Sequence, residues 1–581
     1  MRSLTANEKL LVVLTVSALL WRGLFFPVTQ GAYTDGILQI DAFRQGLTFW
    51  PPLYGLLSRL FVWLPGVGLE GSARIVSWLA GAAVVPVLFA MALRLFGRRA
   101  AIYAAVVWLV SPMALRWSVQ VMTDMTATAL WSAALGALLL AYEQALPELF
   151  PSPPRGAPSP RRTFEWLLIG SLLGTLATLT RYQGILLLPP MALASAHLDR
   201  VLRHRNPSGT ERRTWWGLLP WVAVPLWLLR QGPGPLENHF RQIGERGSRM
   251  DFLQTLYGVY WLQFEEFLRA LPVFLTLGIT GFLLYGLLRT RWETARLRWF
   301  GWLALYLMLA ILALQSVFSS FQARYLLPLL PLVCLFAGHG FATLDRHVKR
   351  RPVYWAVAGA ALGYSLLMAL LVGVWQGSPF LDLKQAALYI NAQEDLRADA
   401  RVYTNELYNA DIQGAKLRFW LNDREVYLEP ATAALMQGSL RDNPPPREGD
   451  LLVLSSAYGG GIAPYRSLIE NLQQQGMARV RRRFPHRLIP FLPDIMAEPG
   501  THQNPLALVL RYRMQVFETT VMEITAAPQR RLENPPAPPL PEPQLPGPNR
   551  ETLQRIESLS REIDALRGAA DRPGTATEPG S

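Results

Sequence analysis

The chain has 581 residues, of which 51% are hydrophobic, and it carries a formal net charge of +14. This length excludes a single ordinary domain, because domains usually hold ~100–200 residues. Nucleic-acid binding is disfavoured, because the basic residues concentrate in short loops between apolar runs. The single cysteine, Cys334, lies within an apolar run, so no intrachain disulfide can form.

Apolar runs of membrane-spanning length occupy the first two thirds of the chain. They are about 17–23 residues long, as an α-helix needs to cross a hydrocarbon core of about 30 Å. We predict about eleven spans, at 8–26, 72–95, 100–117, 124–146, 164–180, 183–198, 214–230, 269–288, 299–318, 325–344 and 353–376. The first run is followed by the bulky Trp21, Phe25 and Phe26, a poor cleavage region, so we expect an uncleaved helix and not a signal peptide. Arg181 interrupts 164–198, which is either two helices at a tight turn or one broken helix.

Basic residues alternate between the predicted loops. The Arg-rich loops contain residues 98–99, 155–162, 200–213, 289–298 and 346–351. The positive-inside rule places them in the cytoplasm together with the N-terminus. The other loops, 27–71, 118–123, 181–182, 231–268 and 319–324, then face outward. We therefore expect a multi-pass protein of a bacterial inner (plasma) membrane, with an extracytoplasmic segment after Trp375.

The composition changes after the last apolar run. We predict a polytopic α-helical membrane domain over 1–378, a soluble α/β domain over 379–525 and a Pro-rich, mostly disordered tail with a short helix over 526–581. In the second part, strands are predicted at 401–404, 426–428, 451–454 and 506–512, and a helix at 464–475. The glycines at 459–461 lack the spacing of a phosphate-binding loop and are interpreted as a flexible turn. An amphipathic helix predicted at 251–268 lies either in the headgroup region or against the protein itself.

Ionisable residues gather at helix ends on the predicted outer side. Charges close to a bilayer are costly unless they serve a purpose or reach water. Convergence of acids and arginines on one membrane face is expected for a site that handles the charged headgroup of a lipid. The candidates are Asp35, Asp41, Asp124, Arg181, Tyr182, Arg324 and Tyr325.

Each candidate also has a purely structural explanation. Asp124 lies in a first helical turn, where the helix dipole favours an acid. Arg181 and Arg324 could extend to lipid phosphates. Asp41 has an amphipathic neighbourhood, which favours a solvated face. The constellation is a stronger signal than any one member.

Four short motifs resemble the GT-C glycosyltransferases, a family that includes protein O-mannosyltransferases and the aminoarabinose transferases of lipid A. The resemblance spans roughly residues 8–376. The motifs are Tyr33-Thr34-Asp35-Gly36 with Trp50-Pro51-Pro52-Leu53-Tyr54, Met122-Thr123-Asp124-Met125, Leu179-Thr180-Arg181-Tyr182-Gln183-Gly184 and Ala323-Arg324-Tyr325-Leu326-Leu327-Pro328-Leu329-Leu330-Pro331.

The resemblance implies a membrane enzyme that uses a polyprenyl-phosphate sugar at the outer membrane face. It implies that Asp35 is a catalytic base or metal-site residue, with Asp124 as a second acid that supports Asp35 or a divalent cation. It also implies that Arg181 and Arg324 hold the lipid phosphate. Many relatives have a second acid where this chain has Gly36. They also have a histidine before the Pro-Pro pair, where this chain has tryptophan, so dependence on a divalent cation (Mg or Mn) is in doubt.

The residue types suit an inverting transfer of a hexosyl or pentosyl group. A carboxylate can deprotonate the acceptor hydroxyl of a protein, lipid or glycan, and arginine offers a planar, permanently charged fork to the departing phosphate. A transporter or flippase for a lipid-linked or anionic solute is the main alternative, although transporters place polar sites near the midplane, often in repeated halves. A non-catalytic assembly scaffold is a third interpretation.

Overall fold

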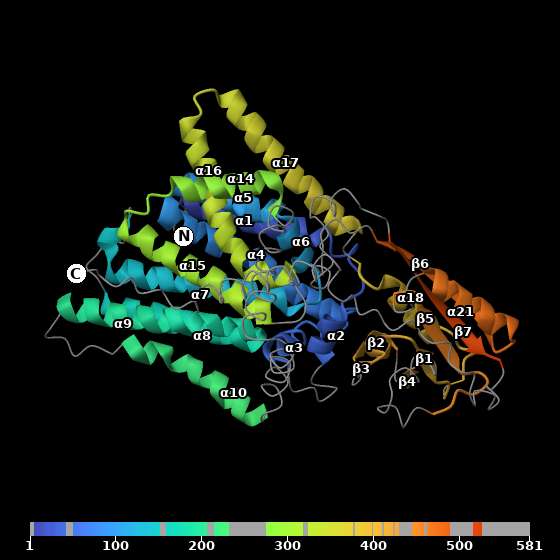
Figure 1. Ribbon diagram of the computed structural model, residues 1–581. Helices are drawn as coiled ribbons and strands as arrows, with labels where there is room; N and C mark the ends of the chain where they lie inside the picture. Colours follow the sequence, from blue (N-terminus) through green and yellow to red (C-terminus); the bar gives the residue numbers. More distant parts are fainter. Residues whose placement is uncertain are drawn as a thin grey trace, which may run out of the picture.

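The computed structural model describes residues 5–41, 50–150, 159–205, 214–231, 275–317, 323–375, 378–397, 399–409, 412–421, 424–428, 444–457, 462–488 and 515–525. A helical bundle formed by the described residues up to Trp375 lies beside a smaller α/β domain (Figure 1). The bundle contains α1 (Ala6–Gly23), α2 (Thr34–Asp41), α3 (Leu53–Leu57), α4 (Leu69–Phe96), α5 (Arg98–Val110), α6 (Pro112–Ser118), α7 (Thr123–Ala145), α8 (Pro160–Thr180), α9 (Leu188–Arg205), α10 (Ala223–Gln231), α14 (Leu277–Arg289), α15 (Ala295–Val317), α16 (Leu330–His347) and α17 (Arg351–Trp375). Short 3-10 segments are η1 (Pro147–Leu149), η2 (Tyr182–Leu187), η3 (Thr214–Val222) and η5 (Ala323–Leu329).

The chain is a multi-pass membrane protein. Within the described residues, 7 helices are long and apolar enough to cross a membrane, or 8 if α5 and α6, which meet at a 60° bend, form one span. Each of the predicted spans overlaps a helical segment. However, α1, α10 and α14 do not meet the same standard, and α1 carries Glu8, Lys9 and Arg22. The number of eleven crossings therefore stays a prediction.

Two helices meet at Arg181, which settles the arrangement of residues 164–198. α8 ends at Thr180, and Arg181 itself is extended, with φ −155° and ψ 129°. Gly184 then lies against the backbone of α8, because a Cβ there would meet the nitrogen of Thr178 at 2.3 Å. Glycine thus allows η2 to fold back closely, and Arg181 sits at the turn.

The C-terminal domain contains a five-stranded mixed sheet in the order β4-β1-β5-β7-β6. β4, β1 and β5 are parallel, whereas β7 is antiparallel to both β5 and β6. The helix α18 covers one face with Leu383 and Ile390, and α21 covers the other with Tyr465 and Ile469. The elements are α18 (Leu381–Asn391), β1 (Val402–Thr404), β2 (Leu407–Asn409), β3 (Ile412–Gln413), α19 (Ala415–Trp420), β4 (Val426–Leu428), β5 (Leu451–Ser455), α21 (Ile462–Gln474), β6 (Ala478–Leu488) and β7 (Gln515–Ile524).

The predicted strands at 401–404, 426–428 and 451–454 and the helix at 464–475 are confirmed, and the predicted domain boundary at 378 lies between α17 and α18. Sequence analysis missed β6 and β7. Five arginines and a proline interrupt the apolar alternation of β6 (Ala478–Leu488), and the alternation is the signal that predicts a half-buried strand. The features predicted at 251–268, 459–461, 506–512 and 526–581 lie outside the described residues.

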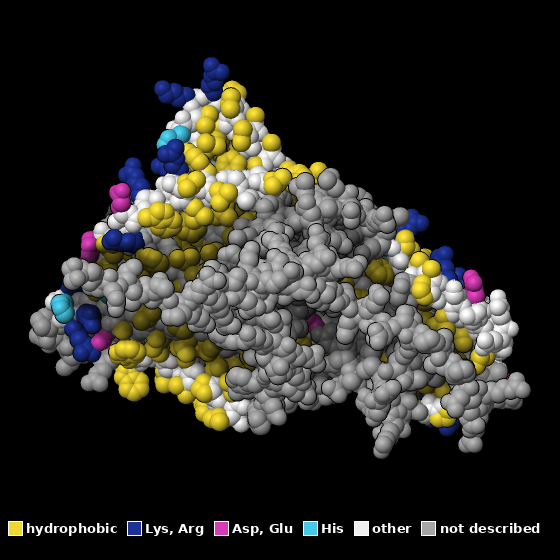
Figure 2. Space-filling model, in the orientation of Figure 1, with side chains coloured by type: hydrophobic (Ala, Val, Ile, Leu, Met, Phe, Trp, Pro, Cys, Tyr) yellow, Lys and Arg dark blue, Asp and Glu magenta, His cyan; other side chains and the backbone are white. Residues whose placement is uncertain are grey.

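Basic side chains mark one end of the bundle. Hydrophobic side chains cover much of its described surface, and Lys and Arg side chains stand out at the α16–α17 turn and at the end away from the C-terminal domain (Figure 2). Asp345 at the end of α16 forms ion pairs with Arg351 and, at 3.2 Å, with Arg99 at the start of α5. We call this side, with the turns α4–α5 and α16–α17, the basic end.

Candidate active site

The helix α2 presents Asp35 at the beginning of α7. Gly36 lies so close to the turn before α7 that a Cβ would meet the carbonyl oxygen of Val121 at 1.9 Å. One turn later, the Gln39 side chain accepts a hydrogen bond from the Thr123 backbone N–H at 3.2 Å. The departure at residue 36 therefore has a physical reason, because the acid that many relatives carry has no space here.

Asp35 forms an ion pair with Arg324 of η5. Arg324 is only 5% exposed, and its Nη1 lies 3.5 Å from the sulfur of Met122. Its guanidinium carbon also lies 5.8 Å from the ring centre of Trp117. Arg324 therefore turns into the protein. The purely structural explanation, in which it extends along the bilayer surface to lipid headgroups, does not apply.

Asp124 forms a second ion pair, with Arg181. Nη1 of Arg181 lies 2.9 Å from Oδ1 of Asp124, whose side chain is 1% exposed. The same Nη1 donates to the Thr123 hydroxyl at 3.2 Å, and Nε donates to the Gln183 side chain at 3.0 Å. The helix dipole favours an acid in the first turn of α7, but it does not account for an arginine, with a side chain 15% exposed, that arrives from the α8–η2 turn.

The ring of Tyr325 brings the two ion pairs together. Its centre lies 4.7 Å from the guanidinium carbon of Arg181 and 5.4 Å from that of Arg324. Cations are attracted to an aromatic face within about 6 Å. Residues from four separate parts of the sequence, with Asp35 and Arg324 a full 289 residues apart, thus form one cluster.

Three further residues, Arg116, Tyr33 and Trp117, adjoin this cluster although they were not among the candidates predicted from the sequence. Arg116 of α6 is 1% exposed, donates a hydrogen bond to the Tyr33 hydroxyl and lies 5.3 Å from the ring centre of Trp117. The Tyr33 and Trp117 ring centres are 5.8 Å apart. The available signal was an arginine at the outer end of the apolar run 100–117. Arg116 therefore joins the cluster through the ring of Trp117, against which Arg324 also lies.

The remaining two candidates, Asp41 and Tyr182, take no part in the two ion pairs described above. Asp41 ends α2 and is 4% exposed, so the interpretation as a solvated face is wrong. Tyr182 begins η2, and its ring centre lies 6.0 Å from that of Trp227 in α10. Tyr182 therefore packs toward α10 on the flank of the ion pairs.

The donor groups do not fit a divalent cation in this arrangement. Asp35 and Asp124 each bind a guanidinium group. In the part of the chain that the structure describes, no three His, Cys, Asp or Glu side chains gather closely enough to hold a metal ion. Mg²⁺ requires a near-octahedral set of oxygen ligands, and a single carboxylate that also binds a guanidinium group does not supply such a set at either ion pair.

Two family models match parts of the chain. Residues 50–153 match the dolichyl-phosphate-mannose-protein mannosyltransferase family, and residues 254–410 match the Alg9-like mannosyltransferase family. A comparison with curated proteins gives no significant match.

Solved structures of two membrane transferases match most of the chain. ArnT from Cupriavidus metallidurans bound to undecaprenyl phosphate is 14% identical, with a TM-score of 0.52, and the match covers 89% of this chain and 98% of that chain. The oligosaccharyltransferase from Archaeoglobus fulgidus in its apo form is 11% identical, with a TM-score of 0.49, over 78% and 70% of the two chains. At this identity the similarity to ArnT is one of fold.

Proposed function

We propose that this chain, which has the fold of the GT-C membrane glycosyltransferases, moves a sugar from a polyprenyl-phosphate donor to an acceptor hydroxyl. The observation that carries the proposal is the two largely buried ion pairs around Tyr325, with both arginines able to face one ligand. Buried charges in a membrane protein are expensive and mark functional sites. A lipid phosphate is an anion whose geometry the guanidinium groups of Arg181 and Arg324 match.

Arg181 and Arg324 bind the phosphate of the donor. Guanidinium groups offer a rigid fork that matches phosphate geometry, and preorganised donors stabilise the charge that develops on the leaving group. Because Arg324 pairs with Asp35, the incoming phosphate competes with Asp35 for the same guanidinium group. When the phosphate takes over Arg324, the Asp35 carboxylate can accept the proton that the acceptor hydroxyl must lose.

An apolar cavity beside the ion pairs suits the lipid chain. It has a volume of about 750 Å³ and lies among α14, α15, η5 and α16. Leu326 and Leu327, which directly follow Tyr325, line it together with Leu283, Met308 and other apolar residues. A prenyl chain in this cavity would present its phosphate to η5, where Arg324 lies.

The reaction is a single displacement. The acceptor oxygen forms a bond to the anomeric carbon while the bond from that carbon to the phosphate oxygen breaks, which inverts the configuration. Asp35 takes the hydroxyl proton as general base, Asp124 holds Arg181 in place, and polyprenyl phosphate leaves with its charge on the arginines. Tyr182, Tyr325 and Asp41 belong to the surrounding binding region.

The site faces the extracytoplasmic side of a bacterial inner membrane. The positive-inside rule supports this orientation, because the basic end lies away from the C-terminal domain. The N-terminus is then cytoplasmic, and the C-terminal domain stands outside, where the acceptor protein, lipid or glycan arrives. A transporter gains no support from the comparisons, since both matching families are named for mannosyl transfer.

Transfer is tested with purified full-length protein in lipid nanodiscs. The donor is undecaprenyl-phosphate [³H]mannose, offered with a panel of hydroxyl acceptors that includes Ser/Thr peptides and lipid A. We expect free undecaprenyl phosphate and labelled acceptor in equal amounts. Movement of intact donor across a proteoliposome membrane, without release of undecaprenyl phosphate, would instead identify a transporter.

Metal dependence is tested in the same assay. We expect the turnover rate to be unchanged after treatment with a chelator, because both carboxylates already bind arginine. A loss of activity that Mg²⁺ or Mn²⁺ restores would contradict this expectation. It would mean that a cation replaces a guanidinium group at Asp35 or Asp124 during the reaction.

A further inference from the structure

The C-terminal domain packs against the helix that carries Asp35. Leu38 on α2 and Ala415 on α19 are both buried and share one hydrophobic cluster. Tyr33, immediately before α2, lies with its ring centre 6.3 Å from that of Phe380, which precedes α18. The start and the middle of α2 thus both lie against the C-terminal domain.

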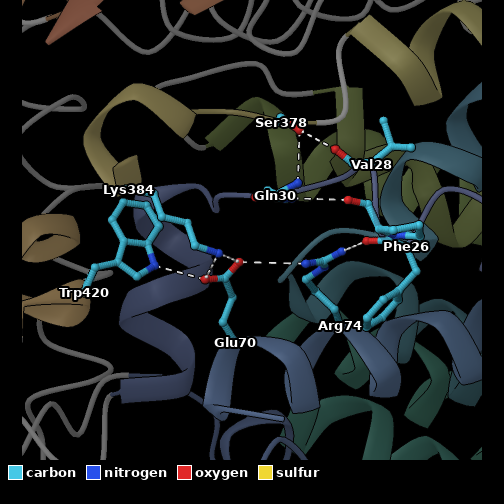
Figure 3. Close-up of polar contacts among 9 residues, drawn as sticks. Phe26, Val28, Gln30, Glu70, Arg74, Ser378, Lys384 and Trp420 are labelled. Carbon is cyan, nitrogen blue, oxygen red and sulfur yellow. Dashed lines mark hydrogen bonds and ion pairs between the residues drawn. The ribbon is translucent and has the colours of Figure 1, made fainter. Parts of the chain in front are cut away.

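Glu70, in the first turn of α4, joins the two domains (Figure 3). Nζ of Lys384 on α18 donates to both carboxylate oxygens at 2.9 Å, and Nε1 of Trp420 on α19 donates to one of them at 3.0 Å. Glu70 is 9% exposed and Trp420 is 7% exposed. A carboxylate of the bundle therefore receives three hydrogen bonds from the C-terminal domain in a mostly dry setting.

Neighbouring contacts fix the chain on either side of this junction. Arg74, one turn after Glu70, donates to the carbonyl oxygen of Phe26, and its guanidinium carbon lies 4.3 Å from the Phe26 ring centre. The Ser378 hydroxyl donates to the carbonyl oxygen of Val28 at 2.9 Å and accepts from the Gln30 N–H at 3.0 Å (Figure 3). The entry to the first outer loop is thereby tied to the entry to the C-terminal domain.

The elements that hold Glu70 are themselves fixed within the C-terminal domain. In α18, Asp382 accepts a hydrogen bond from the Thr519 hydroxyl of β7 at 2.6 Å. At the start of α19, Lys416 forms a fully buried ion pair with Glu406 at 2.9 Å. Because α18 and α19 are fixed within the C-terminal domain, the contacts of Lys384 and Trp420 with Glu70 set the position of the whole domain.

Helix capping alone does not account for Glu70. The dipole of α4 favours an acid in its first turn, and that interaction requires no partner from elsewhere. A buried ion pair is costly to assemble and adds little net stability over apolar packing, whereas it can specify one arrangement. The partner of Glu70 is Lys384, which lies 314 residues further along the chain and in the other domain. This pairing is consistent with a role in specifying how the domains dock.

We propose that Glu70 is the docking acid for the C-terminal domain and that the docked domain positions Asp35 for transfer. Glu70 is a positioning residue, since it contacts neither ion pair of the site. The positioning claim rests on the function proposed above for Asp35, and the docking claim does not. Loss of the hydrogen bonds to Glu70 should lower kcat more than it changes the KM for donor. The reason is that Arg181 keeps its contacts with Asp124 and Gln183, and Arg324 keeps its contact with the Tyr325 ring.

The experiment measures domain position and turnover on the same full-length variants. Spin labels are placed at the exposed Leu56 on α3 and Leu468 on α21, as L56C and L468C with the buried Cys334 replaced by serine. Pulsed dipolar spectroscopy then gives the distance distribution between the domains. The variants are W420F, K384M, E70Q and the conservative K384R. E165Q, which removes the exposed Arg161–Glu165 pair of α8, is the matched control.

We expect a narrow distribution in the parent protein, in K384R and in E165Q. The distribution should broaden from W420F to K384M and E70Q, with kcat falling by up to about 100-fold, the loss that a displacement of about 1 Å can cause. An unchanged distribution in K384M and W420F would overturn the docking claim. A broadened distribution with full kcat would overturn the positioning claim. A parent protein that docks normally and yet releases no undecaprenyl phosphate would refute the proposed function and leave docking by Glu70 established.

Discussion

Arginine–carboxylate pairs occur at both ends of the bundle, and they differ in the exposure of the cation. At the basic end, the side chains of Arg99 and Arg351 are 59% and 58% exposed around Asp345. At the candidate site, those of Arg181 and Arg324 are 15% and 5% exposed. Exposed pairs are screened by water and salt and contribute little. Of these four arginines, only Arg181 and Arg324 carry a large desolvation cost, which points to a functional role.

Charge type alone therefore does not identify the site. Both ends offer arginine to an anion, and exposed arginines at the basic end suit contact with lipid headgroups or water. The candidate site adds aromatic rings on which both guanidinium groups stack. Stacking fixes their direction, which a site for a phosphate and an anomeric carbon requires. The following predictions test this contrast.

Replacing Asp35 with asparagine should have the largest effect. We expect kcat to fall by about 10²–10⁴-fold, the usual contribution of a general base. The rate of undecaprenyl phosphate release measures it, and extraction of the protein from membranes controls for insertion. Retention of near-normal turnover in D35N would refute the role of Asp35 as base.

Replacing Arg324 or Arg181 with lysine should cost nearly as much. Lysine keeps the charge but loses the planar fork, and one lost donor to developing charge costs about 10²–10³-fold in kcat. Inhibition by added undecaprenyl phosphate should weaken in parallel. If both lysine variants keep wild-type kcat and wild-type inhibition, the phosphate binds elsewhere.

Restoring the acid of the relatives at residue 36 should impair this protein. In Gly36→Asp the new Cβ meets the Val121 carbonyl oxygen, so α2 must move away from α7. A displacement of about 1 Å costs up to about 100-fold in kcat, and the thermal transition should also fall. Higher activity in G36D would show that α2 tolerates a side chain and that a second acid serves the reaction.

The basic end supplies the smallest expected effect. In Asp345→Asn the exposed partners Arg99 and Arg351 return to water. We expect no change in kcat and a limited loss of stability, because both arginines stay solvated while only the Asp345 side chain, 8% exposed, loses its charged contacts. Turnover and thermal unfolding measure the two effects. A strong loss of turnover in D345N would erase the distinction between the two ends.

The sequence predicted which candidate residues would lie on one side of the bundle better than it predicted how they pair. Alternation of basic loops assigned Asp35, Asp124, Arg181 and Arg324 to one membrane face, since successive spans must end on opposite sides. It could not tell which arginine pairs with which acid, because that depends on the packing of segments up to 289 residues apart.

The docking of the C-terminal domain was hidden from sequence analysis for a related reason. Glu70 looks like an ordinary first-turn acid, and its partners Lys384 and Trp420 lie in another predicted domain. The short helix α2 has only 8 residues, and its buried face is completed by α19 and by the turn before α7. Contacts of this kind leave no local periodicity to detect.

The most direct test of the central claim is a cryo-electron microscopy structure of the protein in nanodiscs that contain undecaprenyl phosphate. We expect the phosphate between the guanidinium groups of Arg181 and Arg324, beside Tyr325, with its prenyl chain in the cavity lined by Leu326 and Leu327. A phosphate bound at the basic end, or out of reach of both arginines, would contradict the account.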